Sequence, residues 1–381
     1  MMQKQSQPIP PGLTVEYNHD LDVNADFTRQ FQPVGKLLRQ PVVLDLFYRY
    51  EREAKNYKRR FHLLGMLSLV SGTVALICVA LELLVAGLGK HSPGLATVII
   101  ELVALASFCL LLIARVRCYR TRWRIACFAR ERIRQWHFQL FLDGELVEGL
   151  AKTPSTVIIS GKPGAPNNAT DELTRRWREF TENLKSGAGS LDDFLHDSAA
   201  PARMFHPVTP YRDPDIEGRV SCALATLRFN HQAQYSRRKI AHESPTAALS
   251  AREHHHWAES VASITLLLAV LAPAAQLVVL LAHSLRLIED TKTWHTWLFA
   301  AALVLAVLSA SVRAYRTGLT LPEEIESYEE YVTRVGELRE LFLLPGGTME
   351  HRSAVLKDLE IEAARELRRF LVLKGKATFI A

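Results

Sequence analysis

The sequence predicts an all-α integral membrane protein, with four transmembrane helices arranged as two hairpins and with long helical extensions in the cytoplasm. Of the 381 residues, 48% are hydrophobic and 23% are charged, and the apolar residues are concentrated in four blocks. A short link joins the two blocks of each pair, and Lys and Arg residues gather beside the other ends of the blocks. These features are typical of paired membrane helices.

Each apolar block is long enough to cross a bilayer, since a hydrocarbon core about 30 Å thick needs ~20 helical residues. The link at residues 89–94 is so short that the first two blocks must form a tight hairpin, and residues 284–295 join the second pair. Pro273 is expected to kink the third block, which a membrane helix tolerates. The expected spans are residues 63–88, 95–114, 261–283 and 297–314.

Basic residues set the expected orientation, because loops rich in Lys and Arg stay on the cytoplasmic side. The first link carries only Lys90, and the basic residues of the second link are offset by Glu289 and Asp290. Both links are therefore predicted outside and both termini inside. The flanking basic residues include Arg52, Lys55, Lys58, Arg59, Arg60, Arg237, Arg238, Lys239, Arg252, Arg313 and Arg316.

The hydropathy pattern repeats along the chain. Residues 42–150 and 215–345 each read as a charged helix, an apolar hairpin and a second helix. The remaining segments are predicted as an N-terminal segment at 1–41, a linker with a short helix at 151–214 and a C-terminal helix in 346–381. Because one hairpin cannot satisfy its polar faces alone, we expect the two to pair into a four-helix bundle that then oligomerises.

Polar residues inside the apolar blocks are the first candidate site residues. Glu82 and Glu101 each lie roughly seven residues from the first link, which at ~1.5 Å per residue places them about 10 Å below the outer boundary. An ionisable group in lipid is costly and marks a functional site by default. The two glutamates either line a pore, or are protonated or close enough to the surface to reach water. Gln276 is expected to hydrogen-bond between helices.

An arginine-rich helix follows the second block. Its basic side chains either bind anionic lipid headgroups or pack against partner helices, and both interpretations stay open. The arginines concerned are Arg115, Arg117, Arg120, Arg122 and Arg124.

Small residues give the fourth block a predicted packing face. Ala302, Ala306 and Ala310 recur at a spacing of four, which places them on one side of a helix. Such a stripe lets two membrane helices approach closely.

The sequence predicts no catalytic residue, cofactor or metal. Its five cysteines show no CxxC spacing, and neither GxSxG nor HExxH occurs. The glycines at Gly161 and Gly164 lack the spacing of a phosphate loop. Nucleic acid is not expected as a partner, because the basic residues lie beside apolar blocks; the expected partner is the lipid bilayer.

Three stretches of the chain carry a family resemblance: Tyr48–Ala54, Trp123–Arg132 continuing through Gln139, and Arg219–Tyr235. They resemble the bacterial SLATT and SMODS-associated transmembrane effector families of nucleotide-linked anti-phage defence. The likeness is one of architecture, a charged helix, a membrane hairpin and a long helix, and the duplicated hairpin departs from the simple form of those families.

The resemblance implies a non-enzymatic effector in the bacterial inner membrane. Such a protein is held inactive, is triggered during infection, and then oligomerises to breach the bilayer. Its trigger is expected to be a separate sensor protein or a signalling nucleotide. The residues also allow a membrane-anchored scaffold or sensor whose cytoplasmic helices bind a partner protein, and a housekeeping channel.

Overall fold

The computed structural model describes residues 20–23, 25–87, 102–106, 109, 113, 118–153, 168–186, 191–196, 209–241, 251–285, 291–319 and 321–376. Regular secondary structure within these residues is helical, apart from one isolated bridge between Asp143 and Thr209. The prediction of an all-α chain is therefore confirmed for the described residues. Most of the second predicted span, including Glu101, lies outside them, as do Arg115 and Arg117.

The chain forms two compact units, each assembled from three separate stretches. We call them the core unit, which comprises Met1–Lys55, Trp123–Ala247 and Ile325–Val372, and the apolar unit, which comprises Asn56–Arg122, Ala248–Glu324 and Leu373–Ala381. Three long helices contribute residues to both units: α3 (Pro41–Gly87), α14 (Leu321–Phe342) and α15 (Met349–Lys376). The first residues of α5 (Tyr119–Gln139), up to Arg122, also belong to the apolar unit.

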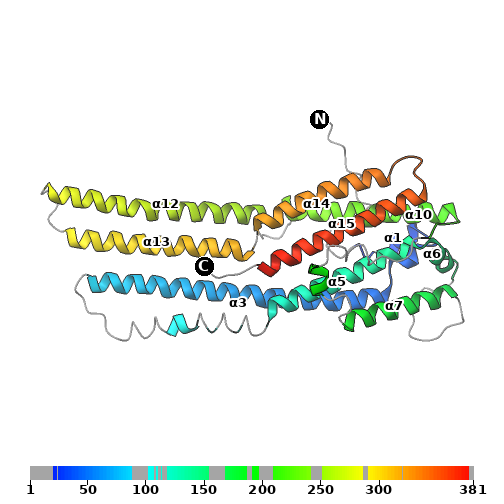
Figure 1. The fold of residues 1–381 in the computed structure, drawn as a ribbon, viewed down its shortest axis with the longest axis horizontal. Helices are drawn as coiled ribbons and strands as arrows, with labels where there is room; N and C mark the ends of the chain where they lie inside the picture. Colours follow the sequence, from blue (N-terminus) through cyan, green and yellow to red (C-terminus); the bar gives the residue numbers. More distant parts are fainter. Residues whose placement is uncertain are drawn as a thin grey trace. The chain divides into compact units, whose positions relative to one another are not determined.

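The core unit packs its helices around large aromatic and aliphatic side chains. Phe47, Phe138 and Phe229 are fully buried there, as expected where apolar surface is removed from water. Besides parts of α3, α14 and α15, its elements in Figure 1 are α1 (Ala25–Gln30), α2 (Gly35–Leu38), α5 (Tyr119–Gln139), η1 (Leu140–Leu142), α6 (Gly144–Ala151), α7 (Asn168–Ser186), α8 (Leu191–His196), α10 (Pro214–Leu224), η2 (Ala225–Asn230) and α11 (His231–Ala241).

Two aspartates start helices of the core unit. The Asp143 carboxylate accepts the backbone N–H of Leu146 at 3.1 Å and the Thr209 hydroxyl at 2.6 Å, which caps α6. Asp213 caps α10, and Pro214 follows at its first position, where a missing N–H costs nothing. The Asp213 cap fixes where α10 begins, and so where the following segment η2 lies.

The apolar unit contains α12 (Ala251–Ser284), α13 (Thr291–Leu319) and most of α3. Within the described residues, three helical stretches are long and apolar enough to cross a membrane: Gly35–Glu82, His256–Ala282 and Trp294–Phe342. They cover most of the first and third predicted spans and all of the fourth. Helix α12 continues as a helix through Pro273. Helices α12 and α13 lie side by side along their length (Figure 1).

Large apolar side chains of this unit face outward, and the residues that its apolar helices bury are small. Val278 is 63% exposed and Leu267 59%, whereas Ala258 and Ala80 are buried. That distribution would be unfavourable in water but suits lipid, where close helix packing rather than apolar burial drives association. The other buried residues here include Ser68, Ala75, Ala262, Ala272, Ala300, Ser309 and Ala314.

Hydroxyl groups join the three apolar helices. Ser309 of α13 donates to the backbone carbonyl of Ala262 in α12 at 3.2 Å, and Ser311 of α13 lies 2.7 Å from Thr73 of α3, oxygen to oxygen. Ser309 and Ser311 are two residues apart, which corresponds to a rotation of about 200° around the helix axis. Helix α13 therefore packs against α12 on one side and against α3 on the other.

The predicted packing face of the fourth span is wrong. Ala306 and Ala310 are exposed, while the buried small residues of α13 are Ala300, Ser309 and Ala314. A stripe of alanines permits close approach on its own face only, but α13 has two neighbours on different sides. Its two serines, which hydrogen-bond to those neighbours, lie on the contact faces instead.

Replacing Ala300 by Leu should destabilise the apolar unit by about 1–3 kcal/mol, because extra methylene groups overpack a close helix contact. Ala306→Leu makes the same change on the same helix at an exposed position, and it should have little effect. Thermal unfolding of the detergent-solubilised chain measures both. Equal effects of the two substitutions would contradict the packing described for α13.

Candidate functional site

The structure places the predicted site residues on separate helices. Glu82 lies half-buried near the end of α3, and Gln276 lies half-buried on α12. On α5, Arg122 is exposed, while Arg120 and Arg124 are partly buried. Neither the pore role of the glutamates nor the headgroup role of these arginines is decided by their placement, so both stay predictions.

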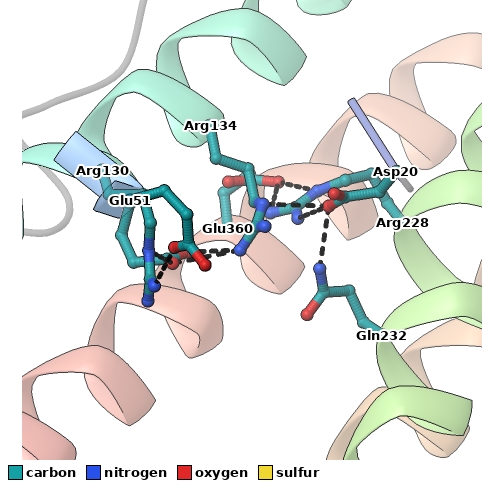
Figure 2. Close-up of polar contacts among 8 residues, drawn as sticks. Asp20, Glu51, Arg130, Arg134, Arg228, Gln232 and Glu360 are labelled. Carbon is teal, nitrogen blue, oxygen red and sulfur yellow. Dashed lines mark hydrogen bonds and ion pairs between the residues drawn. The ribbon is translucent and has the colours of Figure 1, made fainter. Parts of the chain in front are cut away.

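A different group of charged residues forms the most elaborate polar site of the described chain. It lies inside the core unit and draws on the N-terminal segment, α3, α5, η2, α11 and α15 (Figure 2). We call it the charge network, and it consists of Asp20, Glu51, Arg130, Glu131, Arg134, Arg228, Gln232 and Glu360.

Asp20 is the point where most of these segments meet. Its Oδ2 atom lies 3.0 Å from Nε of Arg134 and 3.7 Å from Nη1 of Arg228, and it accepts a hydrogen bond of 3.0 Å from the side-chain amide of Gln232. The Asp20 side chain is fully buried. The chain just before α1 is therefore tied to α5, η2 and α11 through one carboxylate.

Arg228 and Glu360 form the second centre of the network. Arg228 Nε donates to Glu360 Oε1 at 2.7 Å, and its Nη2 donates to the same oxygen. The side chains are only 2% and 1% exposed. The guanidinium of Arg228 also lies 4.5 Å from the ring centroid of Phe138, within the range of a cation–π contact.

The outer part of the network runs along α5. Arg134 Nη1 donates to both carboxylate oxygens of Glu131, at 2.8 and 3.0 Å, and Arg130 Nη1 donates to Glu51 at 2.6 Å. Lys55 closes the outer edge, with its amine 3.0 Å from Glu51. Positions three and four apart share one side of a helix, so Arg130 and Arg134 lie on one side of α5. They share Glu131 as a partner, and each has a second carboxylate of its own.

Burial makes every charge in the network depend on a partner. It opposes the charged form of Arg134, but Asp20 and Glu131 outweigh it and raise the pKa of that guanidinium. Burial likewise opposes the charge on Arg228, yet Glu360 keeps the Arg228 pKa raised. In all, the network contains four carboxylates and three guanidinium groups, with the amine of Lys55 at its edge. Removing one partner would leave a desolvated charge, which is costly.

Two acceptor atoms of the network have capacity left. Among the residues that the structure describes, Asp20 Oδ1 and Glu360 Oε2 are buried and accept no hydrogen bond. A fully satisfied buried network favours one arrangement, whereas a partly satisfied one is the place where a rearrangement costs least.

The segment that presents Arg228 is a π-helix. Element η2 (Ala225–Asn230) lies between α10 and α11 without a break in the chain. Three consecutive side chains of this segment are buried, Leu227, Arg228 and Phe229. Arg228 reaches Glu360, and Phe229 packs on Phe342 with ring centroids 4.9 Å apart. Such π turns recur at functional sites.

The sequence could not have identified this network. Arg130 and Arg134 lie on the arginine-rich helix, but about two and three turns beyond Arg124, the last of the predicted headgroup arginines. The sequence signal for burial of these two arginines is that they lie next to the apolar residues Ile133 and Trp136 on the same helix. Nothing in the sequence pairs them with Asp20 or Glu360, since those partners are distant in the chain.

Comparison with known proteins finds no matching protein-family model, no matching curated protein and no matching solved structure. The charge network and the apolar unit are therefore the features from which a function can be inferred.

Arg228→Met should lower the free energy of unfolding by about 3–5 kcal/mol, because it leaves Glu360 buried without its cation. Combining it with Glu360→Leu removes both charges and should cost less than either single change. Arg334→Met, at an exposed ion pair with Glu337 in the same unit, should change little. Urea unfolding in detergent, followed by circular dichroism, measures all four variants. Additive losses in the double variant would refute a coupled pair.

Acid should destabilise the core unit through His137. Burial, followed by the positive charge of Arg228, lowers the pKa of His137 to about 4 from a usual 6.5. Below pH 6.5 the unfolded chain binds a proton that the folded chain refuses, so this residue costs about 1.4 kcal/mol per pH unit as the pH falls toward 4.

His137→Gln removes that titration, so the variant should lose less stability than the native chain between pH 6.5 and pH 4. Thermal unfolding of both proteins across this window provides the measurement. The raised pKa of Glu360, caused by burial, acts in the opposite direction in both proteins and cancels in the difference. Parallel curves for the two proteins would show that His137 does not titrate as described.

Proposed function

We propose that this chain is a membrane effector which, when its core unit is triggered, oligomerises through four membrane spans and permeabilises the bacterial inner membrane. The observation that carries the proposal is the pairing of two parts in one chain. One part exposes large apolar side chains and joins its helices through hydroxyls, as lipid requires. The other part is a helical unit closed over a buried charge network.

The stretches that resemble the SLATT and SMODS-associated families supply most of the network. Tyr48–Ala54 contains Glu51, Trp123–Gln139 contains all three residues of α5, and Arg219–Tyr235 contains Arg228 and Gln232. The three segments that resemble those families thus meet at one buried site. This supports the view that the network is the part of the effector that responds to a signal.

The chemistry of the network suits a switch. Buried ion pairs contribute little net stability, because desolvation offsets their attraction. An alternative arrangement in which the charges regain water would therefore differ only modestly in free energy from the buried arrangement. A sensor protein or signalling nucleotide that binds the core unit would need only to favour that arrangement. Both remain candidate triggers under this proposal.

Glu82 is the residue of the described chain that we assign to the conducting path. It is half-buried in the part of α3 that belongs to the apolar unit, where the buried residues are small. An ionisable group at that depth is costly unless water or a partner reaches it. We propose that Glu101, on the adjoining predicted span, contributes to the same path.

Membrane potential and dye entry in bacteria that express the full chain test the proposal. With neighbouring genes present, infection should depolarise cells that carry the native chain. Glu82→Gln should slow the depolarisation several-fold, because it removes the ionisable group from the path. Glu182→Gln makes the same chemical change at an exposed position of α7 and should behave as the native chain does.

Membranes that stay intact under every condition would refute permeabilisation. The membrane-anchored scaffold, whose cytoplasmic helices bind a partner protein, would then be the better account of the same structure.

A further inference from the structure

A pocket of about 570 Å³ opens within the apolar unit. It is lined by α12, the end of α13, the start of α14 and the last turn of α15. Its volume falls in the usual range for sites that bind small molecules, about 300–1,000 Å³. Its charged lining residues are Glu259, Arg313, Arg316, Glu323 and Lys376.

The pocket lies where the apolar helices meet their charged ends. Ala262, which also lines it, accepts the hydrogen bond from Ser309 of α13, so this end of α12 is adjacent to that end of α13. The apolar blocks of the sequence begin at about residue 261 and end at about residue 314. The pocket is therefore at the level where a bilayer presents its headgroups.

Cations outnumber anions in the lining, three to two. Arg316 is held only weakly, since its Nη1 atom lies 3.9 Å from Glu259 and both side chains are substantially exposed. An exposed pair of this kind contributes little, so a stronger anion can replace Glu259 as the partner. Arginine matches phosphate through two parallel hydrogen bonds, which a single long carboxylate contact does not provide.

The surface beside the pocket is apolar and open. From Ser263 in the lining, the same face of α12 continues through Leu267 and Leu271, which are 59% and 50% exposed. Residues four apart lie one above the other on a helix. A ligand with its phosphate in the pocket would thus find an apolar stripe for a hydrocarbon chain.

We propose that this pocket binds the phosphate headgroup of an anionic phospholipid, with Arg313, Arg316 and Lys376 as the recognising groups. The acyl chain lies along Leu267 and Leu271 of α12. The inference requires membrane insertion but not permeabilisation, so it stands or falls separately from the proposed effector function.

Native mass spectrometry of the full chain in detergent, with phosphatidylglycerol or phosphatidylcholine added, tests the proposal. The native chain should retain phosphatidylglycerol in preference. Arg313→Gln with Arg316→Gln should weaken that binding roughly tenfold or more, as expected for the loss of charge-assisted hydrogen bonds. Arg334→Gln with Arg365→Gln removes the same charge from exposed positions of the core unit and should leave it unchanged.

Lys376→Gln provides a second variant that cannot act through misfolding, because this lysine is exposed in the last turn of α15. It should also weaken phosphatidylglycerol binding. Equal retention of the two lipids, or unchanged binding in both pocket variants, would overturn the proposal. Complete displacement of the lipid by inorganic phosphate would overturn it as well, by assigning the pocket to a soluble phosphate compound.

Discussion

The buried ion pair between Arg228 and Glu360 constrains the core unit more than any other interaction described here. A desolvated guanidinium tolerates little displacement of its carboxylate, so α15 must lie where the π-helix presents Arg228. Asp20 then extends the same requirement to the N-terminal segment and to α5. The aromatic core fills the space around this frame, with Phe138 placed directly against the buried cation.

The apolar unit obeys the opposite rule of burial. Its inward positions hold alanine and serine, and its leucines face outward, whereas the core unit buries phenylalanine and exposes charge. One chain thus combines a part whose surface suits lipid with a part whose surface suits water. A hydrogen bond from a hydroxyl to a backbone carbonyl, and one between two hydroxyls, replace apolar burial as the specific contacts between these helices.

Both sites discussed above hold arginine in an arrangement that a competing anion can change. In the charge network, Asp20 and Glu360 each keep an acceptor oxygen in reserve among the described residues. In the pocket, Arg316 has only a long contact with Glu259. The proposed triggered effector would need interactions that are specific in geometry but modest in net free energy, and buried or interfacial ion pairs are of that kind.

The sequence by itself determined the helical class and the stretches able to cross a membrane, because hydropathy and helical period are local properties of the chain. Three such stretches are present in the described residues, at the positions predicted. Only the tertiary structure decided which face of α13 is buried and which carboxylates pair with Arg134 and Arg228. A helix face is chosen by its neighbours, and an ion pair by distance in space. Neither is encoded in spacing along the chain, so Asp20 and Glu360 became recognisable only once folding had brought them to the arginines.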